Sequence, residues 1–368
     1  MKKIVLAGLT LAFAMAANAE DAAPSWTDKI SINADARFRH EYTSKTRATD
    51  TAESHKERMR VRFNVNGKVN DKLTAKLRLA TADGANPIST NTTWTDNSSK
   101  KTIFIDVLAV DYKLCEDANL VLGKQEMNLR PIGRSQLVYD DDYTPEGLAI
   151  NGNKPIFARI GVFSIQERSP QATDGTSEPD SWLMAGLAGY KNDHLLVALG
   201  YHNFTALKKN AALTGGFLGN SSTGTGAAAR YVNDYQVGEV LAEVKWKLSG
   251  GTLSVYADYI NNFTADEDNT GELAGTQFQT MDDAGKPLWT FSYTYQATGK
   301  DATVSAVNNS DINNGIDGGF GHIVTVGRTV AANTNLNLAV FRGKVMDVSA
   351  AGTPFWIDRV FADVVVNF

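Results

Sequence analysis

Apolar and polar residues alternate with a period of two along most of this chain. From Met59 to Val65 every second residue is apolar, and the residues between them are Arg or Asn. Successive side chains of a β-strand point to opposite faces, so this pattern predicts a strand with one apolar and one polar face. The run from Leu73 to Leu79 repeats the pattern after an Asn70-Asp71 turn signal. Together the two runs predict a β-hairpin.

About sixteen strands are predicted when this interpretation is extended to the C-terminus. They cover residues 29–43, 56–69, 72–83, 101–113, 119–128, 146–151, 156–166, 181–191, 194–205, 235–248, 252–263, 288–298, 301–307, 321–331, 335–345 and 356–368. Short turns, one of them at 298–300, alternate with long polar loops. The long loops lie near residues 44–55, 84–100, 129–145, 167–180, 206–234, 264–287, 308–320 and 346–355.

This alternation of connections constrains the fold more than the strand count does. An even number of strands with short turns at one end and long loops at the other is typical of outer-membrane proteins. In the last strand, Val360, Val364 and the terminal Phe368 share one face, as expected where a strand meets lipid and its interface. We therefore predict an all-β fold, a transmembrane antiparallel β-barrel with short periplasmic turns and long extracellular loops.

The N-terminus carries the pattern of a secretory signal peptide. Lys2 and Lys3 precede an apolar run that ends in small residues up to Ala19. The run is shorter than the roughly 20 residues that a membrane-spanning helix needs. We predict a signal peptide at 1–19 and a single barrel domain at 20–368, located in the bacterial outer membrane.

Composition excludes several classes of protein. The chain has 36 basic and 41 acidic residues and a net charge of −5, so no basic surface for a nucleic acid is expected. A single cysteine, Cys115, excludes a disulfide scaffold. The five histidines show no metal-binding spacing and no phosphate-binding glycine motif is present. We expect no cofactor, no metal and no catalytic residues.

Basic residues gather on the polar faces of the first three predicted strands. They are Arg37, Arg39, Arg58, Arg60, Arg62 and Arg78. Sixteen strands enclose an aqueous lumen, and a cation at the lipid midplane costs roughly 2–4 kcal/mol, so these side chains are predicted to line the pore. Rows of arginine favour anions. The alternative is that they pair with Asp35, Glu41 and Glu57 and merely fill a polar wall.

The predicted loop 129–145 mixes apolar residues, Pro, Gly and charges. Its charged residues are Arg130, Arg134, Asp140, Asp141 and Asp142. A loop folded into the lumen needs such a mixture, because one side packs on the wall and the other meets water. We predict that these five residues line a constriction opposite the arginines. Alternatives are an ordinary surface loop or a Ca²⁺ site on the three aspartates. A weaker calcium pattern begins at Asp266 but has Gln277 in place of the required Glu.

Several segments resemble the bacterial "putative porin" family. They are Glu57 to Phe63, Lys68 to Asp71, Leu77 to Gly84, Asn86 to Asn91, Leu122 to Gln125 and Asp140 to Leu148. The resemblance covers about residues 56–152 and implies an outer-membrane barrel for small solutes, distantly similar to phosphate-selective and general diffusion porins.

The function expected from these features is a water-filled channel for passive diffusion of small hydrophilic solutes, with a preference for anions. Its expected partners are outer-membrane lipid and lipopolysaccharide and the permeating solutes or ions, with homotrimeric assembly left open. The alternatives are a structural or adhesion barrel and an outer-membrane lipase or protease. The enzyme would need groups such as Ser164 or Ser181 to converge with His194.

Overall fold

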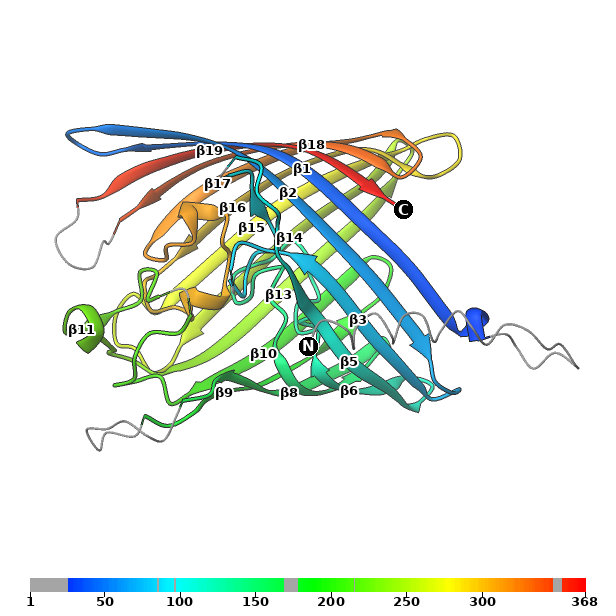
Figure 1. The fold of residues 1–368 in the computed structure, drawn as a ribbon, viewed down its shortest axis with the longest axis horizontal. Helices are drawn as coiled ribbons and strands as arrows, with labels where there is room; N and C mark the ends of the chain where they lie inside the picture. The colour runs from blue at the N-terminus through cyan, green and yellow to red at the C-terminus, as the bar shows by residue number, and fades with distance from the viewer. Residues whose placement is uncertain (1–25, 85, 96, 169–177, 215, 347–352) are drawn as a thin grey trace, which may run out of the picture.

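A computed structural model describes residues 26–84, 86–95, 97–168, 178–214, 216–346 and 353–368. The predicted signal peptide at 1–19 lies outside these residues. Antiparallel strands wind into one barrel, with the first strand beside the last (Figure 1). No helix in the described part of the chain is both long enough and apolar enough to cross a membrane.

The described residues form nineteen strands and four short 3₁₀ helices. The strands of the N-terminal half are β1 (Ile30–Thr46), β2 (Thr51–Lys68), β3 (Leu73–Thr81), β4 (Thr92–Thr93), β5 (Ile103–Cys115), β6 (Ala118–Lys124), β7 (Glu146–Gly152), β8 (Ile156–Gln166) and β9 (Ser181–Lys191). They are followed by β10 (Leu195–Thr205), β11 (Ser222–Thr223), β12 (Arg230–Tyr231), β13 (Tyr235–Leu248), β14 (Gly251–Asn262), β15 (Thr270–Met281), β16 (Pro287–Thr298), β17 (Gly319–Ala331), β18 (Thr334–Val345) and β19 (Phe355–Asn367). The 3₁₀ helices are η1 (Trp26–Lys29), η2 (Gly226–Ala228), η3 (Ser305–Val307) and η4 (Ile312–Asn314).

The sixteen strands other than β4, β11 and β12 form a closed antiparallel barrel. Closure is made by β1, which pairs with β2 on one side and with β19 on the other. The two-residue β4 pairs with β2 beyond the end of β3, while β11 and β12 form a separate two-stranded sheet. The predicted fold class is therefore confirmed.

Two strand predictions are wrong, although their errors cancel in the count. Residues 301–307 form no strand and contain η3, whereas Thr270–Met281, predicted as part of the loop 264–287, forms β15. Thr303 and Val304, which are consecutive residues of the first segment, are both fully buried, so its alternation does not mark one face in water and one apolar face. In β15, Leu273 is 2% exposed and packs toward the lumen. An apolar residue on the lumen face breaks the alternation of polar and apolar residues by which a strand is predicted.

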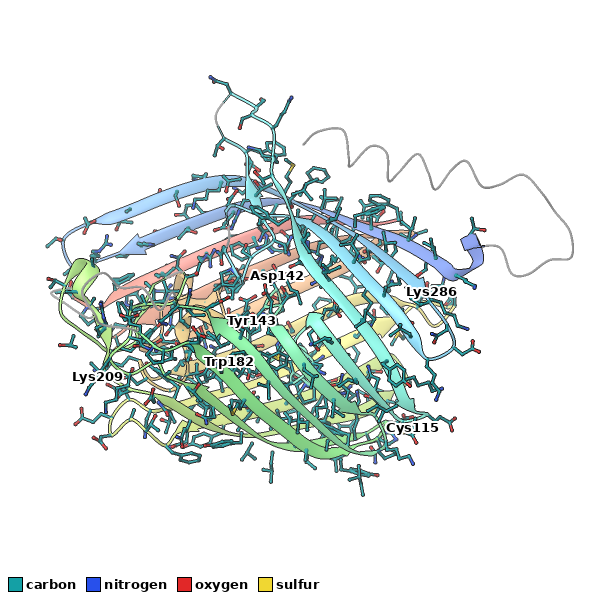
Figure 2. All side chains as sticks on the ribbon, turned by 60° about the horizontal axis from the view of Figure 1, so that its bottom comes forward. Cys115, Asp142, Tyr143, Trp182, Lys209 and Lys286 are labelled. Atoms are coloured by element: carbon teal, nitrogen blue, oxygen red, sulfur yellow. The ribbon has the colours of Figure 1, made fainter. Side chains whose placement is uncertain are left out.

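Two connections also differ from prediction. The expected long loop 44–55 is a four-residue turn at 47–50, because β1 and β2 continue as a paired ladder up to Thr46 and Thr51. The expected short turn at 298–300 is the start of the long loop 299–318 between β16 and β17. Cys115 and Lys286 mark the end of the barrel with short turns, and Lys209 marks the end with long loops (Figure 2).

The barrel wall has an apolar outer face and a polar inner face at the β1–β2–β19 junction. Phe38, Val61 and Val364 are 48%, 38% and 40% exposed, as expected for residues that face lipid. Their neighbours Arg39 and Arg60 are each only 8% exposed and point to the inside. Alternation along each strand thus separates the lipid face from the lumen.

Part of the lumen is filled by connections that fold inward. A buried apolar cluster joins Leu129 and Leu137 from the segment 125–145 with Leu207 from 206–234 and Val304 from 299–318. The cluster includes wall residues such as Phe204. These loops therefore pack largely against the wall formed by β8 to β10 and β13 to β15, while η4 of the loop 299–318 also contacts β17 and β18.

Candidate functional site

The arginines of β1 and β2 form one row on the inner wall. Arg37 is directly opposite Arg60 in the strand register, and Arg39 is opposite Arg58. The same register places Arg62 opposite Asp35. Like charges that face each other directly across two strands destabilise a sheet. The arginine row is therefore expected to have nearby counter-ions or water.

Carboxylates on the neighbouring strands supply most of these counter-ions. The ion pairs are Arg39 with Asp363 at 2.7 Å, Arg60 and Arg62 with Asp35 at 2.8 Å each, Arg58 with Glu41 at 3.4 Å, and Arg359 with Glu41 at 2.7 Å. The alternative that the row is paired therefore holds for Asp35 and Glu41. Glu57 does not take part, because it lies on the outer face and contacts His40.

Arg37 differs from the rest of the row. Its Nη2 donates a hydrogen bond to Asn91 Oδ1 at 2.6 Å, and among the described residues it forms no ion pair with a carboxylate. Its buried Nε has no hydrogen-bond partner there either. Arg37 therefore contributes a positive charge to the lumen that the nearby protein does not neutralise directly.

Arg78 lies on β3, away from the row. It forms ion pairs with Asp106 of β5 and with Glu126, which follows β6. Toward the short-turn end of the barrel, Arg62 and Arg78 line a polar cavity of about 710 Å³ together with Asn64, Lys76 and Asp111. This cavity is bounded by β1, β2, β3, β5, β6 and β7, and it is large enough for many water molecules.

The segment 125–145, which we call the inward loop, meets the arginine row through Asp142. Asp142 Oδ1 is 3.5 Å from Arg62 Nη1, and its Oδ2 accepts hydrogen bonds from Thr90 N and Oγ1 at 3.1 Å each. Burial alone would raise the pKa of Asp142, but Arg60 and Arg62 hold it below its usual value. Asp142 is therefore a charged residue held against a charged wall.

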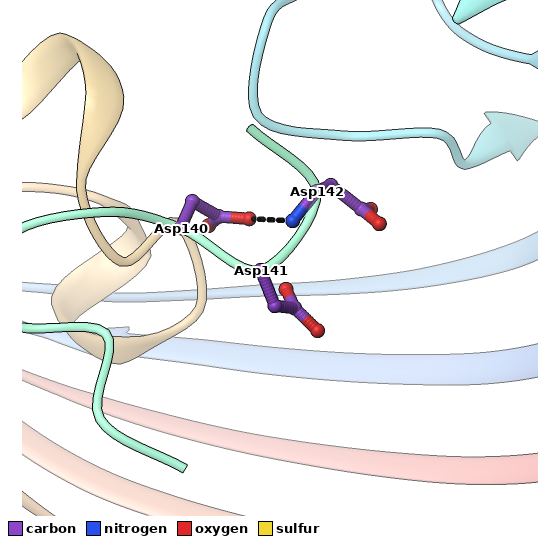
Figure 3. Close-up of side chains that lie close together, drawn as sticks. All are labelled: Asp140, Asp141 and Asp142. Atoms are coloured by element: carbon purple, nitrogen blue, oxygen red, sulfur yellow. Dashed lines mark hydrogen bonds between the residues drawn. The ribbon is translucent and has the colours of Figure 1, made fainter. Parts of the chain in front are cut away.

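Asp140 and Asp141 lie on the same turn but in different environments (Figure 3). Asp140 Oδ1 accepts from Asp142 N at 2.9 Å, and its Oδ2 accepts from Ser310 N at 2.8 Å. Burial and the adjacent Asp141 raise the pKa of Asp140 well above its usual range. Asp141 is exposed. The carboxylates of the three aspartates come within 4.8 Å of one another, but two of them are used to hold loop backbone.

The other end of the inward loop is attached to the opposite wall. Tyr139 Oη and His202 Nδ1 of β10 are 2.8 Å apart, Ser135 bonds to Asp258 of β14, and Arg134 pairs with Glu243 of β13. Arg130, by contrast, donates to the Ser135 and Gly133 carbonyls of its own loop. The structure thus brings Asp142 to the arginine row, whereas Arg130 and Arg134 lie elsewhere.

The positions of the residues do not support the enzyme alternative or the second calcium pattern. Ser164 and Ser181 lie at the long-loop end of β8 and β9, whereas His194 lies in the short turn 192–194 at the other end. The calcium pattern that begins at Asp266 runs into β15 from Thr270 on, so these residues do not form a calcium-binding loop.

Several partners of the predicted residues are not evident from the sequence. Asp363 and Arg359 stand on the polar face of the last strand, and only barrel closure places them beside β1. Ser310, which holds Asp140, belongs to a loop whose start was predicted as a strand. Alternation along the last strand marks Asp363 as inward-facing, but nothing in the sequence identifies its partner.

A closed barrel with a lipid-compatible outer face, a charged aqueous lumen and a loop folded into that lumen defines a bacterial outer-membrane porin. The sequence profile of the family described as "Putative porin" matches residues 45–245. The chain belongs to this family, and it is an outer-membrane diffusion channel. No curated protein was found to match the chain.

Solved porin structures share the fold at low sequence identity. Pseudomonas putida OprB, solved at high pH, has a TM-score of 0.58 and 12% identity, over 93% of this chain and 95% of that one. Salmonella typhi OmpF, in complex with daunomycin, has a TM-score of 0.54 and 11% identity, over 93% and 99%. An anion-selective porin from Comamonas acidovorans has a TM-score of 0.53 and 12% identity, over 92% and 99%.

Proposed function

We propose that this porin favours small anionic solutes, and that Arg37 is the residue most responsible. Its guanidinium has no carboxylate partner among the described residues, whereas Arg39, Arg58, Arg60 and Arg62 are each paired. A paired arginine and its carboxylate cancel at distances beyond a few ångströms. An unpaired arginine acts over the Debye length of about 8 Å. The local field then favours anions although the chain as a whole is acidic.

The inward loop forms the narrow section of this channel in our proposal. It is attached to β10, β13 and β14 on one side and reaches Arg62 on the other through Asp142. Exposed Asp141 sits on the same turn and faces the passage. Solutes that pass between arginines and loop aspartates experience a transverse field, which orients dipolar molecules.

The outer face of β6 to β8 is, we propose, covered by further copies of this chain in a homo-oligomer. β6 and β7 have seven residues each, whereas a transmembrane strand needs about 9–11. At about 3.3 Å per residue and a tilt near 45°, seven residues rise only about 16 Å, less than the apolar band of about 25 Å. Lipid would therefore reach beyond the strand ends.

The distribution of aromatic side chains supports the same proposal. Exposed aromatic residues occur on β1, β2, β5, β9, β10, β13, β14 and β16, where they include Tyr112, Trp182, Tyr201, Trp246 and Tyr259. The large exposed residues of β6, β7 and β8 are aliphatic. Aromatic girdles mark walls that meet the membrane interface, so the wall without them is better suited to protein contact.

We further propose that transport is passive and that the protein has no enzymatic activity. Residues 1–19 are proposed to be removed on export. Planar-bilayer recordings test it directly. Insertion of the purified protein should give stable single-channel currents, and a KCl gradient should give a reversal potential of the sign expected for Cl⁻ over K⁺. Absence of conductance would contradict the channel, and a K⁺-selective reversal potential would contradict only the role of Arg37.

A further inference from the structure

Two histidines that are fifteen residues apart in the sequence lie side by side on the outer face of the β1–β2 hairpin. In the register, His40 is opposite Glu57 and His55 is opposite Tyr42, which makes the two histidines diagonal neighbours. Nε2 of His40 and Nδ1 of His55 are 3.5 Å apart. Both residues are exposed, so their nitrogens are accessible from outside.

The separation of the two nitrogens is informative. Hydrogen bonds between nitrogen atoms are usually shorter than about 3.2 Å. Two ligands on one tetrahedral metal ion, each with a metal–nitrogen distance of about 2.0–2.1 Å, lie roughly 3.3–3.4 Å apart. The observed 3.5 Å is therefore closer to the spacing of two ligands that share a metal than to a good hydrogen bond.

Glu57 is placed to orient His40 as a metal ligand. Its Oε1 lies 2.6 Å from Nδ1 of His40. A proton on Nδ1 then donates to the carboxylate, which leaves the lone pair of Nε2 directed toward His55. A carboxylate that orients the far nitrogen of a metal-binding histidine is the usual outer contact of zinc sites.

The surroundings add negative charge. Glu53 lies two residues from His55 on the same strand face, and its Oε1 accepts a hydrogen bond from Tyr42 Oη at 2.9 Å. The aromatic ring of Tyr42 lies 4.9 Å from that of His55, which restrains the imidazole. Glu53 therefore adds a negative charge on the same face as the two histidines.

We propose that His40 and His55 bind a Zn²⁺ ion at the long-loop end of the β1–β2 hairpin, with Glu57 as the orienting carboxylate and water as the remaining ligands. Imidazole nitrogen favours Zn²⁺ over Ca²⁺ or Mg²⁺, which prefer oxygen. The apolar outer face ends at Phe38 and Met59, so the site lies just beyond the lipid-facing band. It is independent of the lumen, since Arg39 and Arg58 point to the other face.

Titration of the detergent-folded barrel with zinc chloride, followed by calorimetry at pH 7.5, tests this site. We expect one saturable site per chain. His40→Ala and His55→Ala should each abolish it, and Glu57→Gln should weaken affinity about tenfold. Excess Mg²⁺ or Ca²⁺ should not compete, because these ions prefer oxygen ligands.

His194→Ala is the matched control, because His194 is exposed and lies in a short turn at the other end of the barrel. It should leave zinc affinity unchanged. Zinc should also protect His40 and His55, but not His194, from diethylpyrocarbonate in a mass-spectrometric map. Unchanged binding in His40→Ala and His55→Ala, with heat-modifiable barrel intact, would overturn the proposal, as would equal loss in His194→Ala.

Discussion

Arg62 of β2 and Asp142 of the inward loop meet inside the barrel, with Nη1 and Oδ1 3.5 Å apart. The same carboxylate accepts two hydrogen bonds from Thr90, in the loop after β3. One side chain thus connects the arginine row, the loop 82–102 and the inward loop. The position of the narrow section that we propose therefore depends on charges that also act on permeating ions.

Removal of the unpaired arginine is predicted to shift ion selectivity. A unit charge about 6 Å from an ion in water contributes roughly 0.7 kcal/mol, or about threefold in local anion concentration. Arg37→Ala should lower the anion-to-cation permeability ratio by at least about threefold at low salt. Reversal potentials under a KCl gradient measure this ratio.

Arg37→Lys is the matched control for that experiment, because it keeps the charge, and its ratio should stay close to wild type. The effect of Arg37→Ala should shrink in 1 M salt, where the screening length is about 3 Å. A ratio that Arg37→Ala leaves unchanged at low salt would place Arg37 outside the narrow section.

Two aspartates of equal charge and adjacent position are predicted to act differently. Asp141→Asn and Asp142→Asn each remove one negative charge, so both should raise the anion-to-cation ratio. Only Asp142 is tied to Arg62 and Thr90, and loss of a buried charged partner costs about 1–3 kcal/mol. Asp142→Asn should therefore also increase open-channel current noise, recorded in bilayers. Equal noise in both variants would show that Asp142 does not hold the loop.

The lipid face gives a prediction about assembly. Val61 is 38% exposed on the outer wall, while its neighbour Arg60 is 8% exposed and points inward. Val61→Lys should reduce the yield of heat-modifiable barrel, because a lipid-facing cation costs up to about 2–4 kcal/mol. Arg60→Lys keeps a cation in the lumen and should fold normally. Similar yields for both variants would mean that the register of β2 is shifted by one residue.

Sidedness can be checked with inserted epitope tags. Gly224 lies in the loop 206–234, and Asp193 lies in the turn between β9 and β10. Both ends of an even-stranded chain lie on one side, so the turns should be periplasmic and the long loops extracellular. Antibody should label a tag at Gly224 in intact cells, and a tag at Asp193 only after permeabilisation. Labelling in the reverse order would invert the topology.

Alternation and turn signals could predict the barrel because each wall residue experiences only lipid or water. The rule failed where protein replaces water inside the lumen. Leu273 of β15 is apolar yet faces inward, since inward-folded loops cover it. Residues 301–307 alternate but are buried on all sides. Both errors have the same cause, the packing of loops within the barrel.

The sequence could predict which arginines belong to the candidate site, but not which carboxylates pair with them. The arginine row follows from the period of two. The partner of Arg39, however, is Asp363, 324 positions later in the chain, and the contact exists only because β1 and β19 close the barrel. Likewise, the strand register and the loop positions determine which arginines receive a carboxylate partner, and Arg37 has none among the described residues.

The loop 299–318 carries a buried carboxylate that makes its attachment depend on pH. Asp317 Oδ2 accepts from Ser305 Oγ at 2.6 Å, and both its oxygens accept from Asn308 Nδ2 at 2.9–3.0 Å. Burial raises the pKa of Asp317 from 3.8 to about 7. When the loop is undocked, the carboxyl regains its ordinary pKa, so between about pH 4 and 7 the docked loop holds the proton more tightly.

Docking is therefore favoured at acidic pH and weakens as the pH rises toward 7, by at most about 1.4 kcal/mol per pH unit. Hydrogen exchange of residues 299–318, after correction for intrinsic rates, should show greater protection at pH 5 than at pH 7.5. Asp317→Asn retains a neutral side chain that can bond to Ser305 and Asn308, and it should reduce this pH dependence; Asp140, which binds Ser310 N, and Asp311 also have raised pKa values and supply the remainder. Protection that rises with pH in the wild type, or a pH dependence that is as large in Asp317→Asn as in the wild type, would show that another group governs the loop.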